Sequence, residues 1–116
     1  MTSLASQTRT KVVCLSGQIN ASNAFQFRER LNQCLRASSP VELVLDMSQV
    51  EFLDSAGLMV LVNTLAVAQK MNSQLILCCI PPSVQIILEL TQLNRAFSIL
   101  KARPVDSAEV VEAIAA

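Results

Sequence analysis

The sequence contains no histidine, tryptophan or tyrosine, and it has only two glycines, Gly17 and Gly57. Without histidine, a Ser-His-Asp triad cannot form. Two distant glycines cannot build the G-x-G-x-x-G turn of dinucleotide-binding proteins or a P-loop. A G-x-S-x-G nucleophile turn around Ser55 would need glycine at position 53, which is Leu53. We therefore expect that the chain is not an enzyme and carries no cofactor.

The charges are balanced, with nine basic and nine acidic residues and a net charge of zero. Nucleic-acid binders need clustered lysine and arginine, and base stacking needs aromatic side chains, so we expect no nucleic-acid partner. No apolar stretch approaches the roughly 18 to 20 residues of a membrane span. Residues 1–7 lack the charged and apolar regions of a signal peptide. These features predict a cytoplasmic protein without membrane insertion.

The four cysteines, Cys14, Cys34, Cys78 and Cys79, form no C-x-x-C pair. A structural zinc site would need closely spaced cysteine or histidine ligands. If Cys78 and Cys79 both lie within a strand, they point to opposite faces of the sheet. We therefore expect buried, reduced thiols and no metal, in preference to a redox or metal role.

Apolar runs with the pattern of strands alternate with segments of helical periodicity. Strands are predicted over residues 11–16, 41–47, 75–80 and 97–100. A first helix is predicted between the caps at 20–23 and the loop at 38–40, and a second over 55–71. A third is predicted after Pro81-Pro82. A fourth is predicted over 110–115, because residues 106–109 resemble a capping box. This alternation predicts one α/β domain over residues 11–116 with a mainly parallel sheet. Residues 1–10 form a short polar segment that could add an edge strand.

The segment from Asp54 to Leu58 stands where the second strand gives way to an apolar helix. Serine at a helix start is typical of an N-cap, so we expect Ser55 to cap this helix. The positive end of the helix dipole favours added negative charge there, which makes Ser55 a candidate phosphorylation site. Capping alone is the more common role for such a serine.

The surroundings of Ser55 are acidic, because no basic residue lies between Arg36 and Lys70. A phosphate there would add to an acidic surface and repel a closely fitted partner, which is the charge pattern of an off-switch. Three of the nearby carboxylates could bind Mg²⁺ at strand ends, although capping roles are preferred: Asp46, Glu51 and Asp54.

The helix after Ser55 is apolar nearly all round. Its core stripe is predicted at Leu58, Leu61, Val62 and Leu65, and Met59, Val60 and Val67 lie beyond that stripe. Such a helix is either deeply buried, which is the commoner case, or part of a partner interface. Its first turn, with Ala56, Leu58 and Met59, would surround Ser55, so we assign this end to recognition.

Four segments together resemble the STAS domain of bacterial anti-sigma factor antagonists. They are residues 15–20 (Leu-Ser-Gly-Gln-Ile-Asn), 43–48 (Leu-Val-Leu-Asp-Met-Ser), 50–58 (Val-Glu-Phe-Leu-Asp-Ser-Ala-Gly-Leu) and 88–97 (Leu-Glu-Leu-Thr-Gln-Leu-Asn-Arg-Ala-Phe). The Asp-Ser-x-Gly-Leu element is the most specific of these, and the similarity spans about residues 11–115. The resemblance implies a four- to five-stranded mixed sheet with helices packed mainly on one face.

The resemblance also implies a partner-switching function in transcription regulation. The unphosphorylated domain would bind an anti-sigma factor that is a serine/threonine kinase and so free the sigma factor. The kinase would phosphorylate Ser55 and release the domain, and a metal-dependent serine phosphatase would restore it. The implied partner-binding residues are Gly17, Asn20, Asp46, Asp54, Ser55, Ala56, Gly57, Leu58 and Met59.

Two departures from the family pattern affect these expectations. Gln18 and Asn20 replace acidic residues of the family, so a charged contact to a partner becomes a hydrogen bond. The short polar start could leave a sheet edge unpaired, which would favour a homodimer. Two other functions remain open: a non-switching STAS subunit of a transporter or larger signalling assembly, and small-ligand binding, which the lack of a glycine-rich loop disfavours.

Overall fold

The computed structural model describes residues 9–104 and 110–116. Its elements are β1 (Arg9–Ile19), α2 (Ala24–Ser38), β2 (Val41–Leu53), α3 (Ser55–Lys70), β3 (Gln74–Cys78), α4 (Pro82–Leu90), the short 3₁₀ helix η1 (Leu93–Arg95), β4 (Ser98–Leu100) and β5 (Val110–Ala115). The expected single α/β domain is confirmed as a five-stranded sheet with three α-helices. None of the described helices combines the length and apolar character needed to cross a membrane.

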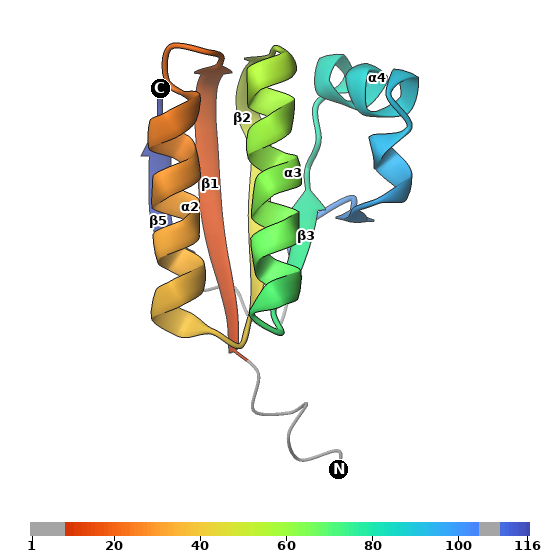
Figure 1. The fold of residues 1–116 in the computed structure, drawn as a ribbon. Coiled ribbons are helices and arrows are strands. Elements are labelled where there is room, and N and C mark those ends of the chain that lie inside the picture. Colours follow the sequence, from red (N-terminus) through yellow and green to blue (C-terminus); the bar gives the residue numbers. More distant parts are fainter. Residues whose placement is uncertain (1–8, 105–109) are drawn as a thin grey trace.

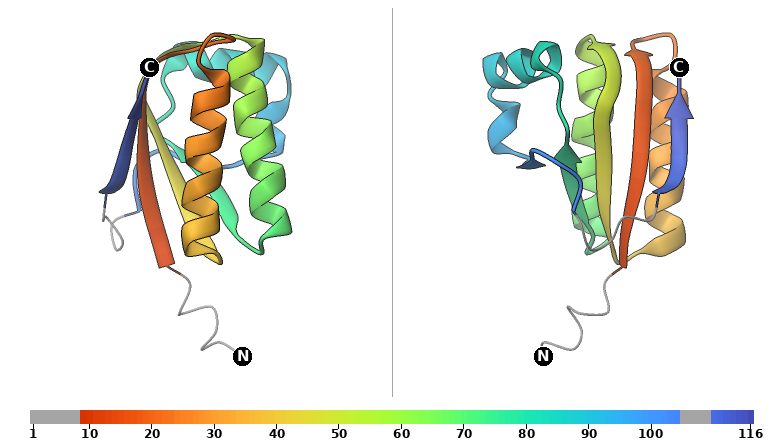
Figure 2. Two further views of the ribbon diagram at one scale, coloured as in Figure 1. Left: turned by 60° about the vertical axis from the view of Figure 1, so that its left-hand side comes forward. Right: turned by 180° about the vertical axis from the view of Figure 1, so that it is seen from behind.

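The strands lie in the order β4-β3-β2-β1-β5 (Figure 1). All four pairings between described strands are parallel, so the antiparallel component implied by the resemblance does not occur among them. α2 and α3 lie side by side on one face of the sheet, and α4 lies at the β3 side, as the views in Figure 2 show. The expectation that helices pack mainly on one face is therefore confirmed.

The main core lies between the sheet and these helices. Alternate residues of β2 from Val41 to Met47 are fully buried beneath α2 and α3, as the period of two predicts. α4 contributes Val84 and Leu88 to the same core. In α3 the predicted stripe is rotated: Leu61 is buried as expected, but Leu58, Val62 and Leu65 are only partly buried. The fully buried positions of this helix are Gly57, Val60, Leu61, Thr64 and Ala68.

The segment from Val110 to Ala115 forms β5 rather than the predicted helix. Its backbone pairs with the outer edge of β1, which would otherwise lack a partner on that side. Glu112 then reaches α2, where it forms an ion pair with Arg30 and accepts a hydrogen bond from the Cys34 thiol at 3.3 Å. Long-range pairing thus overrides the helical signal of a short segment. The capping box at 106–109 lies outside the described residues, as does most of the 1–10 segment.

Candidate functional site

The start of α3 is capped by Asp54, and Ser55 is the first residue of the helix. Asp54 has extended backbone angles, and its carboxylate accepts a hydrogen bond from the Gly57 N–H at 3.0 Å. The Asp54 N–H donates to the Ile19 carbonyl oxygen at 3.2 Å, which holds Asp54 in line with the end of β2. The expectation that Ser55 caps this helix is therefore wrong, because its neighbour occupies the capping position.

Ser55 is exposed, and its hydroxyl makes no side-chain hydrogen bond with any residue that the structure describes. A hydroxyl that caps a helix is committed to the backbone, whereas this one is available to another molecule. Its place in the first turn puts it near free N–H groups and the positive end of the helix dipole, where a phosphate is electrostatically favoured. The geometry therefore suits covalent addition of an anion at Ser55.

Gly57 lets the start of α3 approach the end of β1. A Cβ atom at this position would lie 2.5 Å from the Ile19 carbonyl oxygen and 3.2 Å from a side-chain carbon of Leu53. Such contacts are too short for any side chain, so the approach requires glycine. As a result, the turn that follows Ile19 lies beside the segment from Asp54 to Gly57.

That turn is built by asparagine side chains. Asn20 Oδ1 accepts hydrogen bonds from the Ser22 N–H at 3.0 Å and the Ser22 hydroxyl at 2.6 Å. Asn23 Oδ1 accepts from the Asn20 N–H at 2.9 Å, and its amide nitrogen donates to the Gln18 carbonyl oxygen at 2.8 Å. Because these amide groups bond to the turn itself, Asn20 has a structural role here, and the turn presents a fixed shape beside Ser55.

A groove of about 280 Å³ runs between the first turns of α2 and α3. It is lined by Ala24, Phe25, Arg28, Ala56, Met59, Val60 and Asn63. The side chains of Phe25 and Met59 are 64% and 60% exposed, and the Arg28 guanidinium lies 5.3 Å from the centre of the Phe25 ring. Exposed large apolar side chains around a hollow are typical of a surface that meets a partner.

Phe25 and Arg28 are site residues that the sequence analysis missed. Phe25 and Phe27 stand two positions apart in α2 and therefore about 200° apart around the helix, so both cannot face the core. Phe27 is buried and Phe25 is exposed. Arg28 also places a cation in the groove that Ala56 lines. Arg28 is distant from Ser55 in the sequence, so the order of charges along the chain does not reveal it.

Asp46 lies away from this surface. It was expected at the end of its strand, but β2 continues to Leu53, roughly 20 Å further along at about 3.3 Å per residue. Asp46 is buried, and its carboxylate accepts hydrogen bonds from Arg103 at 2.7 Å and from the Ser48 N–H at 2.9 Å. Burial raises the pKa of Asp46, but these hydrogen bonds and the Arg103 charge outweigh it, so the pKa lies below its ordinary value.

Two further expectations concern Gly17 and the Mg²⁺ alternative. Gly17 has a φ of +88°, and a Cβ there would lie 2.8 Å from the Cβ of Ala116, so this glycine allows close approach of the segment after β5. Among the described residues, the carboxylates of Asp46, Glu51 and Asp54 do not form a group that could hold a metal ion. The structure therefore joins Asp54, Ser55, Ala56, Gly57, Leu58 and Met59 with the turn around Asn20, and leaves Asp46 outside.

Comparisons with known proteins identify the family of the chain. The sequence profile of the STAS domain matches residues 2–108. A protein of Bordetella bronchiseptica that is named as an anti-sigma factor antagonist, BtrV, is 26% identical over 92 residues, which cover 79% of this chain and 78% of that protein.

Two solved structures are similar. One, described as an anti-sigma factor antagonist from Thermotoga maritima, has a TM-score of 0.68 and 26% identity, and the match covers 80% of this chain and 78% of that one. The other, the anti-sigma factor antagonist SpoIIAA in its unphosphorylated form, shares the fold with a TM-score of 0.64 and 16% identity, covering 83% and 84%. The chain therefore belongs to the STAS domain family and is a distant homologue of anti-sigma factor antagonists.

Proposed function

We propose that the chain is a phosphorylation-switched anti-sigma factor antagonist. Its unphosphorylated form binds an anti-sigma factor that is also a serine kinase, and phosphate on Ser55 ends that binding. The observation that carries the proposal is the position of Ser55, which is exposed at the first residue of α3 while Asp54 supplies the cap. The hydroxyl can be modified without loss of the hydrogen bond that holds the helix start in place.

The groove beside Ser55 supports the proposed binding surface. A partner that covers Phe25 and Met59 would remove two large apolar side chains from water. Asn63 also lines this groove, and its buried Oδ1 atom has no hydrogen-bond partner among the described residues. Ser55 stands in the first turn of the helix that forms one wall of this groove.

The switch would work through charge and desolvation. Phosphate adds between about −1.5 and −2 charges at neutral pH. A partner that fits closely over the start of α3 would have to remove water from these charges, which costs more than the helix dipole returns. Arg28 is directed over the Phe25 ring and is the one cation that lines this groove in the described part of the chain, so compensation by this chain is small.

The covalent step transfers one phosphoryl group. The Ser55 oxygen forms a bond to the γ-phosphorus of ATP, the bond from that phosphorus to the bridging oxygen breaks, and ADP and a proton leave. A metal-dependent phosphatase would return the serine by adding water and releasing inorganic phosphate. The description of SpoIIAA as being in its unphosphorylated form indicates that phosphorylation is a state of that relative, which supports the same cycle here.

The test compares Ser55→Asp and Ser55→Ala as baits in extracts of the native cells. Asp should reduce recovery of the serine kinase at least tenfold, equivalent to about 1.4 kcal/mol of binding free energy. Ala should retain binding and should abolish phosphorylation when ATP is added. Ser83, an exposed serine in the first turn of α4, offers the matched control: Ser83→Asp adds the same charge to another helix start and should not change recovery.

Two results would contradict the proposal. The first is a Ser55→Asp bait that recovers the kinase as well as the unchanged chain does. The second is native protein that never carries phosphate on Ser55 under any growth condition, as measured by phosphosite mass spectrometry. Recovery of transporter components instead of a kinase would support a non-switching subunit.

A further inference from the structure

A row of metal-ligating side chains crosses the sheet on the face opposite α2 and α3. Cys14 of β1, Asp46 of β2 and Cys78 of β3 are direct neighbours in the register of three adjacent parallel strands. Cys78 belongs to the small apolar cluster on this face, against which Cys14 and Cys79 also pack. Residues 101–104, which follow β4, lie on this side of the sheet in the rear view of Figure 2, and Arg103 forms an ion pair with Asp46.

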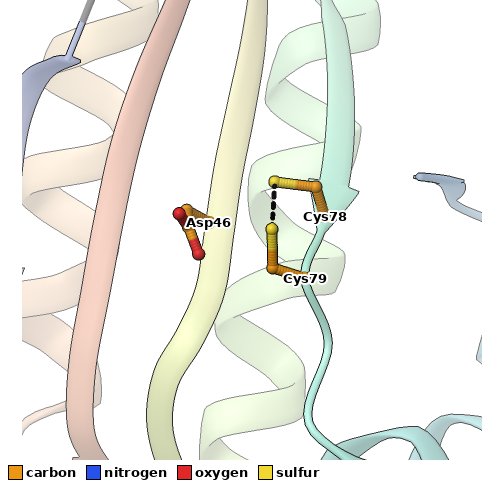
Figure 3. Close-up of side chains that lie close together, drawn as sticks. All are labelled: Asp46, Cys78 and Cys79. Atoms are coloured by element: carbon orange, nitrogen blue, oxygen red, sulfur yellow. Dashed lines mark hydrogen bonds between the residues drawn. The ribbon is translucent and has the colours of Figure 1, made fainter. Parts of the chain in front are cut away.

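Cys79 joins this row because the chain turns sharply after β3. Its φ is +59°, a left-handed conformation, and its N–H donates to the Leu100 carbonyl oxygen at 3.3 Å. Cys78 and Cys79 would point to opposite faces if both lay within the predicted strand over residues 75–80. That prediction is wrong, because the strand ends at Cys78. Their sulfur atoms lie 3.4 Å apart and on the side of Asp46 (Figure 3).

We propose that Asp46, Cys78 and Cys79 form a zinc site. A carboxylate oxygen and the two sulfur atoms all lie within 4.8 Å of one another, without any rearrangement of the backbone. Zinc–sulfur bonds of about 2.3 Å at tetrahedral angles place two thiolates about 3.8 Å apart, close to the separation of these sulfurs. Two thiolates with a carboxylate suit Zn²⁺ better than Mg²⁺ or Ca²⁺, which prefer oxygen ligands. The fourth position would hold water.

Two groups hold the Asp46 carboxylate in a fixed orientation. Arg103 donates to Asp46 Oδ2 at 2.7 Å, the Ser48 N–H donates to Oδ1 at 2.9 Å, and a second Arg103 nitrogen lies 2.9 Å from the sulfur of Cys14. Such hydrogen bonds orient a ligating carboxylate and are a usual feature of metal sites.

The charges at the site also balance. Zn²⁺ forms two zinc–sulfur bonds and one zinc–oxygen bond, and the two thiols release their protons to solvent. Before binding, the charges of Asp46 and Arg103 cancel. After binding, the two thiolates offset the metal charge, so the net charge of this buried site does not change. No redox partner is needed.

One of the three ligands is partly exposed. Cys79 is only partly buried, and it also lines a cavity of about 400 Å³ between α4 and β4, together with the polar residues Gln85, Glu89, Asn94 and Lys101. Asp46 and Cys78 are buried, so Cys79 is the ligand that an ion from solvent would meet first. The proposal rests on this geometry and is independent of phosphorylation at Ser55.

The test is a competition titration of the reduced, purified protein with Zn²⁺ and a chromophoric chelator. We expect one ion per chain, and an affinity weaker by at least about 100-fold in Cys79→Ser and Cys78→Ser, because loss of a group that only orients a ligand already costs up to about that factor. Cys34→Ser is the matched control, because it removes a buried thiol that faces Glu112 instead, and its affinity should not change. Co²⁺ bound in place of zinc should show thiolate-to-metal absorption that decreases in Cys79→Ser.

Three outcomes would overturn the proposal. They are the absence of stoichiometric binding to the reduced protein, an equal loss of affinity in Cys34→Ser and Cys79→Ser, and bound Co²⁺ without thiolate absorption. If Cys78→Ser fails to fold because its side chain is fully buried, the partly exposed Cys79 still provides the test. Mass spectrometry before titration separates the dithiol from a Cys78–Cys79 disulfide, and binding by the oxidised form would also refute a thiolate site.

Discussion

The cap at the start of α3 gives the sharpest test of the structure. The sequence predicts Ser55 as the N-cap, whereas the structure has Asp54 in that position. Asp54→Ala removes the carboxylate that accepts from the Gly57 N–H at 3.0 Å. Loss of an N-cap side chain costs about 1 kcal/mol, and loss of a negative charge at a helix start adds about 0.5 kcal/mol. We therefore expect Asp54→Ala to lower the free energy of unfolding by about 1.5 kcal/mol.

Ser55→Ala should behave differently. Ser55 is exposed, and its hydroxyl makes no side-chain hydrogen bond within the described chain. Alanine is also the better helix former by up to about 0.5 kcal/mol. The expected change is therefore within about 0.5 kcal/mol of zero. Asp54→Asn is the matched control, because asparagine caps as well as aspartate and removes only the charge; it should fall between the other two variants.

Urea unfolding measures these differences directly, because the midpoint shifts while the slope stays constant if only stability changes. For a domain of this size, about 1.5 kcal/mol corresponds to a fall of roughly 6 °C in the melting temperature. The reasoning would be refuted if Ser55→Ala lost about 1 kcal/mol while Asp54→Ala lost nothing. That result would make Ser55 the cap and would remove the main support for its availability to a kinase.

Two other predictions test the packing around the site. Gly57→Ala should destabilise the fold by about 1 to 3 kcal/mol in the same urea assay, despite the helix propensity of alanine, because its Cβ would lie 2.5 Å from the Ile19 oxygen; a gain in stability would contradict that contact. Burial raises the pKa of Glu112, but hydrogen bonds from Arg30 and Cys34 outweigh it and hold the pKa below 4.5. Its stabilisation, about 0.5 to 1 kcal/mol, is present above pH 4.5 and lost as the pH falls through the lowered value. Glu112→Gln should therefore be less stable than the unchanged chain at pH 7, and this difference should shrink as the pH falls below 4.5; an unchanged difference at low pH would contradict this.

The sequence predicted well where a local pattern and the tertiary environment agree. The placement of Val41, Leu43, Leu45 and Met47 in the main core follows from their spacing of two along β2, and the three helices follow from their periodicity. The boundary between β2 and α3 could also be predicted, because the cap-forming residues Asp54 and Ser55 stand between an apolar strand and an apolar helix.

The failures occurred where distant residues decide the outcome. Val110 to Ala115 is too short for its pattern to separate a strand from a helix, and pairing with β1 settles it. Asp54 and Ser55 both belong to residue types that cap helices well. The hydrogen bond from the Asp54 N–H to the carbonyl oxygen of Ile19, 35 residues earlier in the sequence, fixes Asp54 in the capping position. The left-handed turn at Cys79 has no glycine or asparagine to reveal it.

The strand order also has a consequence for biosynthesis. β1 leaves the ribosome before the other described elements of this domain, but its outer neighbour β5 follows all of them. During translation, the helices and the inner strands can pack while one long edge of β1 remains unpaired. An open edge of this kind can pair with strands of other nascent chains. Rapid docking of β5, helped by the bond between Glu112 and Arg30, would therefore protect the newly made protein from aggregation.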